Sequence, residues 1–471
     1  MRQALSHFQT ACQVTIGERA RLASPPKESV APLDVTSPTS RLPKSADTSL
    51  FREGPLDRLT PKASVPGWSS LRVVPPLRVP GYQRGHGTGD GRNRFASPGS
   101  VVESLVVRIL WLFGPPGVGK SVTSWELLNL LSDRHEATSY VDIDQLGMAD
   151  PEPGDEGEAH VRKAWALAAV SRVHAQRGAT TLVVSGVLDP DQMEFYRRAL
   201  ADFDLALVRL AVDEVVLRRR MDSRGHYAED WFGVLAHARR HEAAGHTLPV
   251  VRTDGGTPSE VARRVLDAAR TLPIASSARA DESTPATATE VARAMLITGS
   301  RVIGKSTVGW LAFMMARQSK IPTAFVDLRQ LGFHGRAGGP TDHALQAATT
   351  GALWRVFRAR GNQLLLLNGT TDDPAQANLY ADHLNGTPMN TIRLTAARSE
   401  LTARARARSR GEMAPLAGDD IVGADEVYLQ SIVHDALLAQ ESWSLTNQLV
   451  LDTTSLSATD SARMVLDLAT T

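Results

Sequence analysis

Two short segments of this chain have the residue pattern of a phosphate-binding loop. The first reads GPPGVGKS from Gly114 to Ser121, and the second reads GSRVIGKS from Gly299 to Ser306, so both match GxxxxGKS. Glycines let such a loop curl so that successive N–H groups point at phosphate oxygens, and the helix that follows directs its positive N-terminal end at them. The lysine then reaches the β- and γ-phosphates, and the next hydroxyl group binds Mg²⁺. We therefore expect two sites that bind ATP with Mg²⁺.

The residues expected to bind nucleotide follow from this pattern. In the first loop they are Gly114, Gly117, Gly119, Lys120, Ser121 and Val122, and in the second they are Gly299, Gly304, Lys305, Ser306 and Thr307. Ser121 and Ser306 are the expected metal ligands, and Lys120 is also expected to stabilise the phosphoryl group in transfer. Two of only seven lysines complete these motifs, so a chance match is a poor explanation. The second loop lacks the Pro-Pro-Gly segment of the first, and we expect it to bind nucleotide more weakly.

Two carboxylates follow the first loop at the end of the next predicted strand, in the segment VDID. Side chains two positions apart on a strand share a face, so Asp142 and Asp144 are expected to enter the crevice above the strand ends together. One could hold the water shell of Mg²⁺, and the other could orient or deprotonate a substrate hydroxyl. We assign Asp142 to metal binding and catalysis, and Asp144 to catalysis. The alternative is a solvated turn whose carboxylates cap the next helix.

The corresponding segment after the second loop is VDLR, which keeps Asp327 but has Arg329 in place of the second aspartate. A cation cannot act as a base and repels Mg²⁺, so impaired or altered chemistry is expected there, unless Arg329 contacts an anionic group. The third predicted strands end in VVSG and LLNG, without the acidic residue that motor ATPases place there. This counts against an AAA-type or helicase ATPase.

An arginine-rich helix is predicted after the fourth strand of each half. Arginines at this place suit a lid that closes over the phosphates and neutralises charge on the transferred group. We select Arg220 and Arg224 as catalytic candidates, with solvated helix-face residues as the alternative. The second half carries a comparable set, Arg404, Arg406, Arg408 and Arg410. His241 and His246 have no metal-site partners at a suitable spacing, and we expect them at the surface.

From about residue 101, short β-rich runs alternate with amphipathic helical stretches, which predicts parallel sheets with helices on both faces. In the first half the predicted strands cover residues 106–113, 139–143, 181–185, 206–210 and 249–251. In the second half they cover residues 294–298, 323–327, 363–368, 391–394 and 448–451.

The second half repeats the first beyond the two loops. Residues 141–147 read VDIDQLG, and residues 326–332 read VDLRQLG at the same offset of 185 that separates Lys120 from Lys305. A fixed offset over several motifs indicates an internal repeat. We therefore predict an α/β fold with two tandem P-loop NTPase domains, residues 101–272 and 292–471, joined by a linker over residues 273–291. Residues 1–100, rich in Pro, Ser, Arg and Gly, are predicted to be disordered, as a regulatory tail or as the result of an upstream start codon.

Composition excludes several classes of protein. The chain has 471 residues and a net charge of +1, so no overall field recruits nucleic acid or an anionic membrane. Cys12 is the single cysteine, which rules out disulfides within the chain and cysteine-built zinc sites. No apolar run approaches the about 20 residues that span a bilayer. We expect a cytoplasmic protein whose partner is a small molecule, and the oligomeric state stays open.

The motif GPPGVGKS, a strand ending in VDID, a third strand without an acid and an arginine-rich lid helix together resemble the small-molecule P-loop kinases. This group includes shikimate, gluconate, adenylylsulfate and nucleoside kinases, and the resemblance covers about residues 104–270 and again 292–471. It implies a five-stranded parallel sheet with a mobile lid. It also implies that Asp142 and Asp144 serve magnesium and the acceptor hydroxyl. No motif that defines the substrate of one member is found, and the tandem arrangement is not typical of the group.

Two functions from different classes are compatible with these features. The leading hypothesis is a kinase that transfers the γ-phosphoryl group of ATP to a small-molecule hydroxyl, mainly in the first half. The alternative is a non-catalytic nucleotide sensor, favoured by Arg329 and by the missing acid on the third strands. A GTPase or motor ATPase is the least favoured, because no guanine-reading Asn-Lys-x-Asp pattern is found.

Overall fold

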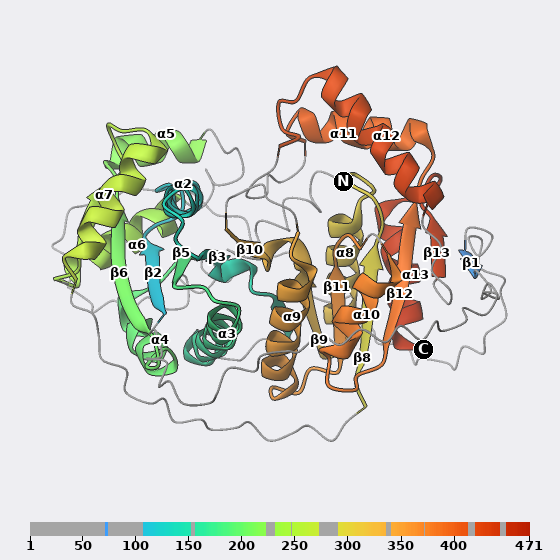
Figure 1. The fold of residues 1–471 in the computed structure, drawn as a ribbon, viewed down its shortest axis with the longest axis horizontal. Helices are drawn as coiled ribbons and strands as arrows, with labels where there is room; N and C mark the ends of the chain where they lie inside the picture. Colours follow the sequence, from blue (N-terminus) through green and yellow to red (C-terminus); the bar gives the residue numbers. More distant parts are fainter. Residues whose placement is uncertain are drawn as a thin grey trace, which may run out of the picture.

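The computed structural model describes residues 71–73, 107–151, 156–222, 231–245, 247–272, 291–335, 341–371, 373–412, 420–442 and 449–471. These residues form two parallel-rich β-sheets with helices on their faces, an α/β architecture that fits a P-loop NTPase (Figure 1). We call residues 107–272 the first unit and residues 291–471 the second unit. No helix among the described residues is long and apolar enough to cross a membrane.

The first sheet has the strand order β10-β3-β5-β2-β6-β7. Its five parallel strands come from the first unit: β2 (Arg108–Phe113), β3 (Thr138–Asp142), β5 (Thr181–Gly186), β6 (Asp204–Ala211) and β7 (Val250–Arg252). Strand β2 lies in the middle and pairs in parallel with β5 and β6. Both neighbours are therefore beside the first loop where β2 ends.

The second sheet has the order β1-β13-β12-β8-β11-β9-β4. Its five parallel strands come from the second unit: β8 (Arg293–Thr298), β9 (Thr323–Asp327), β11 (Leu364–Asn368), β12 (Met389–Thr395) and β13 (Leu449–Asp452). Strand β8 occupies the central place that β2 has in the first sheet. All ten strands expected from the sequence are thereby confirmed, with ends that differ by a few residues.

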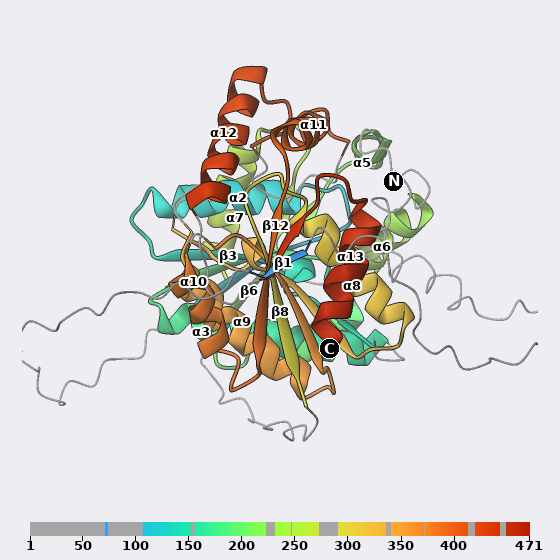
Figure 2. The ribbon, with the colours of Figure 1, turned by 90° about the vertical axis from the view of Figure 1, so that its right-hand side faces the viewer.

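Helices cover both faces of each sheet. The first unit contains α2 (Lys120–Ser132), α3 (Glu156–Gln176), α4 (Met193–Ala199), α5 (Glu214–Asp222), α6 (Trp231–Ala243) and α7 (Pro258–Arg270). The second contains α8 (Lys305–Gln318), α9 (His343–Arg358), α10 (Pro374–Asp382), α11 (Arg398–Ser409), α12 (Glu426–Ser442) and α13 (Ala458–Thr470). Helices α8 and α13 pack on one face of the second sheet and α9 and α10 on the other (Figure 2).

The two units exchange short strands. After Gly147, β4 (Met148–Asp150) leaves the first unit and pairs antiparallel with β9 at the edge of the second sheet. After Gly332, β10 (Phe333–His334) pairs antiparallel with β3 at the edge of the first sheet. Each exchanged strand covers an edge that would otherwise present unpaired backbone groups. The exchange was not expected from the sequence.

A continuous hydrophobic core also joins the units. Helices α3 and α9 pack against each other, and one buried cluster contains residues of α3 and α4 together with residues of α9 and α10. Asp150 of the exchanged strand pairs with Arg317 at 3.1 Å, and its carbonyl accepts a hydrogen bond from Asn362. The two units are therefore packed as one body.

The N-terminal segment contributes one short strand. Residues 71–73 form the short strand β1 (Leu71–Val73), which pairs antiparallel with β13, so the first hundred residues contribute one strand to the second sheet. The pairing partner supplies the order that the local sequence does not predict. The rest of residues 1–100 and the predicted linker up to residue 290 lie outside the described residues.

Candidate nucleotide sites

The first loop connects β2 to α2 in the curled form that the glycines predict. Gly114, Gly117 and Gly119 have φ angles of 145°, 81° and 105°, a region that side chains with a Cβ rarely adopt. The Nζ atom of Lys120 donates hydrogen bonds to the carbonyls of Gly114 at 2.9 Å and Pro115 at 3.0 Å. The ammonium group thus lies in the curl of the loop. Val122 is 52% exposed on the first turn of α2.

Asp142 stands at the end of β3 beside this loop. Its Oδ2 accepts a hydrogen bond from the Ser185 hydroxyl at 3.0 Å and a longer one from the Ser121 hydroxyl at 3.4 Å. A serine hydroxyl and a carboxylate this close are oxygen ligands of the kind that Mg²⁺ prefers. Ser121 and Asp142 therefore fit a magnesium ion at the mouth of the first loop.

Asp144 does not lie on the strand, which corrects the argument from strand periodicity. The strand ends at Asp142, and residues 143–145 form a short 3-10 helix capped by Asp142, whose Oδ1 accepts from the Asp144 N–H at 3.0 Å. The two carboxylates come together through this cap rather than through a shared strand face. The Asp144 carboxylate accepts a hydrogen bond from Lys163 of α3 at 2.9 Å.

The two carboxylates have different acidities. Burial, reinforced by repulsion from Asp144, raises the pKa of Asp142 to about 6. Burial alone would raise the pKa of Asp144 too, but attraction to Lys163 holds that pKa below its ordinary value. Asp144 therefore stays ionised to lower pH than Asp142, and Asp142, the weaker acid, is the carboxylate whose charged form a bound cation would most stabilise.

Arg220 of α5 lies against the first loop. Its guanidinium donates to the Val118 carbonyl at 3.1 Å and to the hydroxyl and carbonyl oxygens of Thr253 at 2.9 Å each. These bonds tie the phosphate-binding loop to the turn after β7. Arg224, the other arginine selected from the sequence, lies outside the described residues.

The second loop repeats this geometry with one strained residue. Lys305 donates to the carbonyls of Gly299 and Ser300 at 2.9 and 2.7 Å, and the Ser306 hydroxyl donates to Asp327 at 3.2 Å. Gly299 and Gly304 have φ angles of 139° and 97°, but Val302 has a φ of 55°, which is costly for a β-branched residue. Thr307 follows on the first turn of α8.

Electrostatics differ in the second site. Burial lowers the pKa of Lys305 to about 7, an effect that Asp327 partly offsets. Burial also raises the pKa of Asp327, and its Oδ2 accepts a hydrogen bond from Asn368 at 2.9 Å. The Arg329 N–H donates to Asp327 at 3.1 Å, as the Asp144 N–H does to Asp142, so Arg329 occupies the place of the second carboxylate.

Several residues at these sites were missed by the sequence reasoning. Ser185 and Asn368 end the third strands and contact Asp142 and Asp327, at positions examined only for an acid. Lys163 pairs with Asp144 from α3, which no local pattern predicts.

His241 was expected at the surface, but it is buried at 3% exposure on the inner face of α6. Its spacing of seven from the apolar Val234, which puts both residues on one helix face, was the signal that could have placed it inside.

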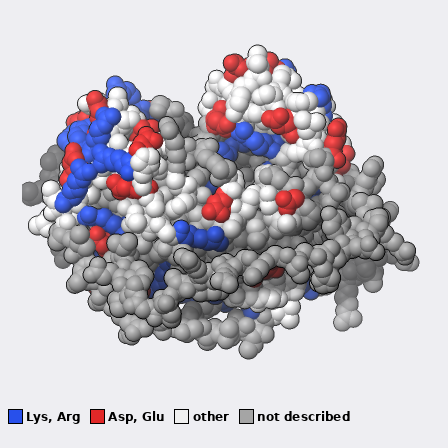
Figure 3. All heavy atoms as spheres, viewed as in Figure 1, with Lys and Arg blue, Asp and Glu red and all other residues white. Residues whose placement is uncertain are grey.

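On the face in Figure 3, Lys and Arg side chains gather on the lobe that carries α5, α6 and α7, with acidic side chains among them. Ion pairs on this lobe include Arg239 with Glu214 at 3.5 Å and Arg218 with Asp222 at 3.0 Å. Opposite charges thus alternate over this part of the described surface.

Comparisons with known proteins agree with the geometry of the first site. A family model described as an AAA domain matches residues 109–249. A shikimate kinase from Streptomyces coelicolor is 31% identical over 166 residues, which are 34% of this chain and 94% of that protein. The chain therefore belongs to the small-molecule P-loop kinase-like proteins. Within that class, about a third of its length is similar to shikimate kinase.

Solved structures with similarity to parts of the chain include a gluconokinase from Sinorhizobium meliloti 1021, at 21% identity, covering 35% of this chain and 93% of that one, with a TM-score of 0.27. Another is the tunicamycin resistance protein of Deinococcus radiodurans, at 19% identity, covering 36% of this chain and 99% of that one, with a TM-score of 0.29. Likenesses at these TM-scores do not bear on function.

Proposed function

We propose that the first unit transfers the γ-phosphoryl group of ATP to a hydroxyl of a small molecule. The observation that carries the proposal is the pair of differently tuned carboxylates beside a complete phosphate-binding loop. Asp142 accepts from the loop serine at 3.4 Å, and Asp144 is held as a carboxylate by Lys163 at 2.9 Å. A kinase needs one such group for its metal and another for the acceptor.

The residues have distinct roles in this proposal. Gly114, Gly117 and Gly119 shape the loop that holds the phosphates, and Lys120 neutralises charge on the group in transfer. Ser121 and Asp142 would hold Mg²⁺, which supplies further charge neutralisation when bound. Asp144 orients the acceptor hydroxyl and accepts its proton. Arg220 fixes the loop from the side of α5, and Arg224, selected from the sequence, is proposed as a second arginine that neutralises charge on the transferred group.

The second unit is proposed to be a diverged copy of the first domain. It repeats the strand order, the loop geometry and the buried aspartate, and Arg404 contacts Ile303 and Thr453 as Arg220 contacts Val118 and Thr253. Lys305 and Ser306 would bind nucleotide with Mg²⁺, but Arg329 leaves no second carboxylate for an acceptor. A regulatory nucleotide site, with chemistry confined to the first unit, is the corresponding role.

The proposal extends to the setting of the protein. A cytoplasmic location, where ATP is abundant, and a small-molecule acceptor rather than nucleic acid are parts of it. Shikimate, the substrate in the name of the similar kinase, is the first acceptor to test, followed by gluconate, nucleosides and adenylylsulfate, the acceptors that the sequence resemblance implies.

The test is ADP release by the full-length chain with ATP, Mg²⁺ and a panel of shikimate, gluconate, nucleosides and adenylylsulfate. We expect acceptor-dependent ADP release from one member or a close analogue, and loss of it in Asp144→Asn but not in Arg329→Ala. ATP binding without phosphorylated product across the panel would count against a kinase and favour the nucleotide sensor.

A further inference from the structure

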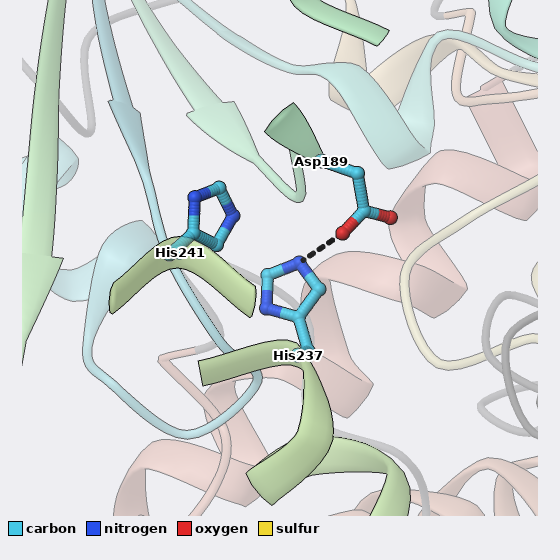
Figure 4. A group of neighbouring side chains, drawn as sticks. All are labelled: Asp189, His237 and His241. Carbon is cyan, nitrogen blue, oxygen red and sulfur yellow. Dashed lines mark ion pairs between the residues drawn. The ribbon is translucent and has the colours of Figure 1, made fainter. Parts of the chain in front are cut away.

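A cluster of two histidines and one aspartate lies in the first unit, apart from the carboxylates assigned above. His237 and His241 are one turn apart on α6, and Asp189 follows β5 in the turn before α4 (Figure 4). One ligand atom from each residue lies within 4.8 Å of the others. The Nε2 atom of His237 lies 3.3 Å from the Asp189 carboxylate.

The histidines are buried where the fold does not require polar groups. His237 is 1% and His241 3% exposed, on the face of α6 that also buries Trp231 and Val234. The corresponding helix of the second unit, α12, buries Leu429, Ile432, Val433 and Ala436 instead. An apolar face is therefore sufficient for packing at this position, and the imidazoles need another explanation.

The ligand atoms are in a form that can bind a cation. Within the described part of the chain, Nδ1 of His237 has no hydrogen-bond partner. Asp189 occupies the N-cap position of a short 3-10 helix without making the capping hydrogen bond, so its carboxylate is turned toward α6.

We propose that His237, His241 and Asp189 form a site for a divalent transition metal, with Zn²⁺ as the best match. Two imidazoles and one carboxylate are ligands typical of zinc, whereas Mg²⁺ prefers oxygen ligands alone. Three protein ligands leave a fourth position for water or a substrate oxygen. The site is beside the first loop, because His241 contacts Phe113, whose ring is 5.2 Å away and which directly precedes Gly114.

One contact opposes the metal. The guanidinium of Arg240 donates to Asp189 at 3.1 Å and competes with a cation for that carboxylate. Arg240 is half-exposed, so its side chain can turn to solvent when a metal binds. Removing this arginine should therefore strengthen metal binding, a result that a purely structural histidine cluster does not predict.

The test uses the untagged full-length chain, freed of metal by chelator and titrated with Co²⁺, whose visible absorption reports tetrahedral coordination. We expect one equivalent to bind with such a spectrum and to be displaced by Zn²⁺. His237→Ala and His241→Ala should weaken binding by more than the about 10–100-fold that loss of an outer-shell partner costs. His434→Ala, which removes an exposed histidine of α12, is the matched control and should bind like the wild type.

Two milder variants keep the test decisive if a histidine variant fails to fold by circular dichroism. Asp189→Asn should weaken Co²⁺ binding, and Arg240→Ala should strengthen it. The proposal is overturned if the wild type binds no Co²⁺ with a tetrahedral spectrum, or if folded Asp189→Asn binds as tightly as the wild type. None of these readouts depends on phosphoryl transfer, so the metal site and the kinase proposal fail separately.

Discussion

In the first unit the strand after the phosphate-binding loop leads to two carboxylates, Asp142 and Asp144, whereas in the second it leads to Asp327 and Arg329. The local backbone hydrogen bond is the same, since in each unit the aspartate that ends the strand accepts from the N–H two residues on, at 3.0 Å and 3.1 Å. The helix that follows differs in a matching way. Lys163 pairs with Asp144 and lies three residues after His160. The residue three positions after His343 is Gln346, whose side-chain oxygen accepts a hydrogen bond from the Tyr380 hydroxyl.

Other contacts around the two sites are the same in both units. His160 bonds the Tyr196 hydroxyl at 2.9 Å, and His343 bonds the Tyr380 hydroxyl at the same distance. Arg220 and Arg404 make equivalent bonds to their loops. The two units thus differ in the Lys163–Asp144 ion pair, while the contacts around it are the same. The loop geometry and the charge beside it can therefore vary independently.

The loop lysines give the strongest test of this comparison. Removing Lys120 takes away charge neutralisation on the transferred group, so Lys120→Ala should reduce the rate of phosphoryl transfer by about 10²–10³-fold. Lys305→Ala should leave transfer within a few-fold and abolish nucleotide binding at the second site. Steady-state ADP release and equilibrium nucleotide titration measure the two effects. Equal loss of transfer in both variants would show that the units do not differ in chemistry.

A buried histidine distinguishes the units in acid. His174 of α3 and Phe357 of α9 each stand fourteen residues after the histidine that bonds a tyrosine. Burial, with repulsion from His334 and a smaller opposing effect of Asp342, lowers the pKa of His174 to about 3. The unfolded chain therefore binds more protons than the native one below about pH 6.5, so stability falls as pH falls through that value.

At pH 5, the protonation of His174 in the unfolded chain should by itself lower the free energy of unfolding by about 2 kcal/mol. His174→Phe, which places the residue of the second unit here, should remove this contribution to the loss of stability. His237, with its pKa of about 2, should still contribute a similar loss. Urea unfolding of both proteins at pH 7 and pH 5 measures the difference. If the variant loses as much stability as the wild type between these pH values, His174 is not a neutral buried group.

Much of the frame could be predicted from the sequence, because its signals are local. The GxxxxGKS loops require positive φ angles that glycine adopts freely, and alternating apolar runs placed all ten parallel strands. Asp142 was correctly placed at the end of a strand. The contacts of Ser185, Lys163 and Asn368 could not be predicted, since they join elements far apart in the chain.

The strand exchange was hidden for a similar reason. The repeated VDxxQLG motif was recognised, but the sequence did not show that the residues after its glycine form a strand that pairs with the other sheet. Strands of two or three residues have no periodicity to detect, and their partners are in the other unit. Gly147, with a φ of 108°, makes the turn that sends β4 across.

The exchanged strands β4 and β10 allow the two units to be compared at their interface. The Phe333 ring lies 5.0 Å from Trp125 and 5.8 Å from Tyr140, both in the first unit. Met148 packs instead against the core of the second unit. Because each side chain is only partly buried, each truncation to alanine should cost about 1–2 kcal/mol, less than for a fully buried residue.

The loss should appear in the unit that receives the side chain. Phe333→Ala should speed hydrogen exchange in β3 and leave β9 unchanged, and Met148→Ala should do the reverse. Mass spectrometry of peptides from residues 138–142 and 323–327 measures both. If each variant instead speeds hydrogen exchange in the unit from which its substituted residue comes, the exchanged strands do not stabilise the edges that they cover.

The smallest expected effect concerns the strained loop residue. Val302 and Gly117 occupy the same place in the two loops, both at positive φ. Val302→Gly relieves about 1–2 kcal/mol of left-handed strain but removes a buried isopropyl group of similar value, so the free energy of unfolding should change by less than about 1 kcal/mol. Gly117→Val has no such compensation, because a Cβ there would lie 2.7 Å from the Met221 sulfur. Urea unfolding measures the stability of both variants. If Val302→Gly destabilises the protein as much as Gly117→Val does, the packing of the Val302 side chain contributes more to stability than its backbone strain costs.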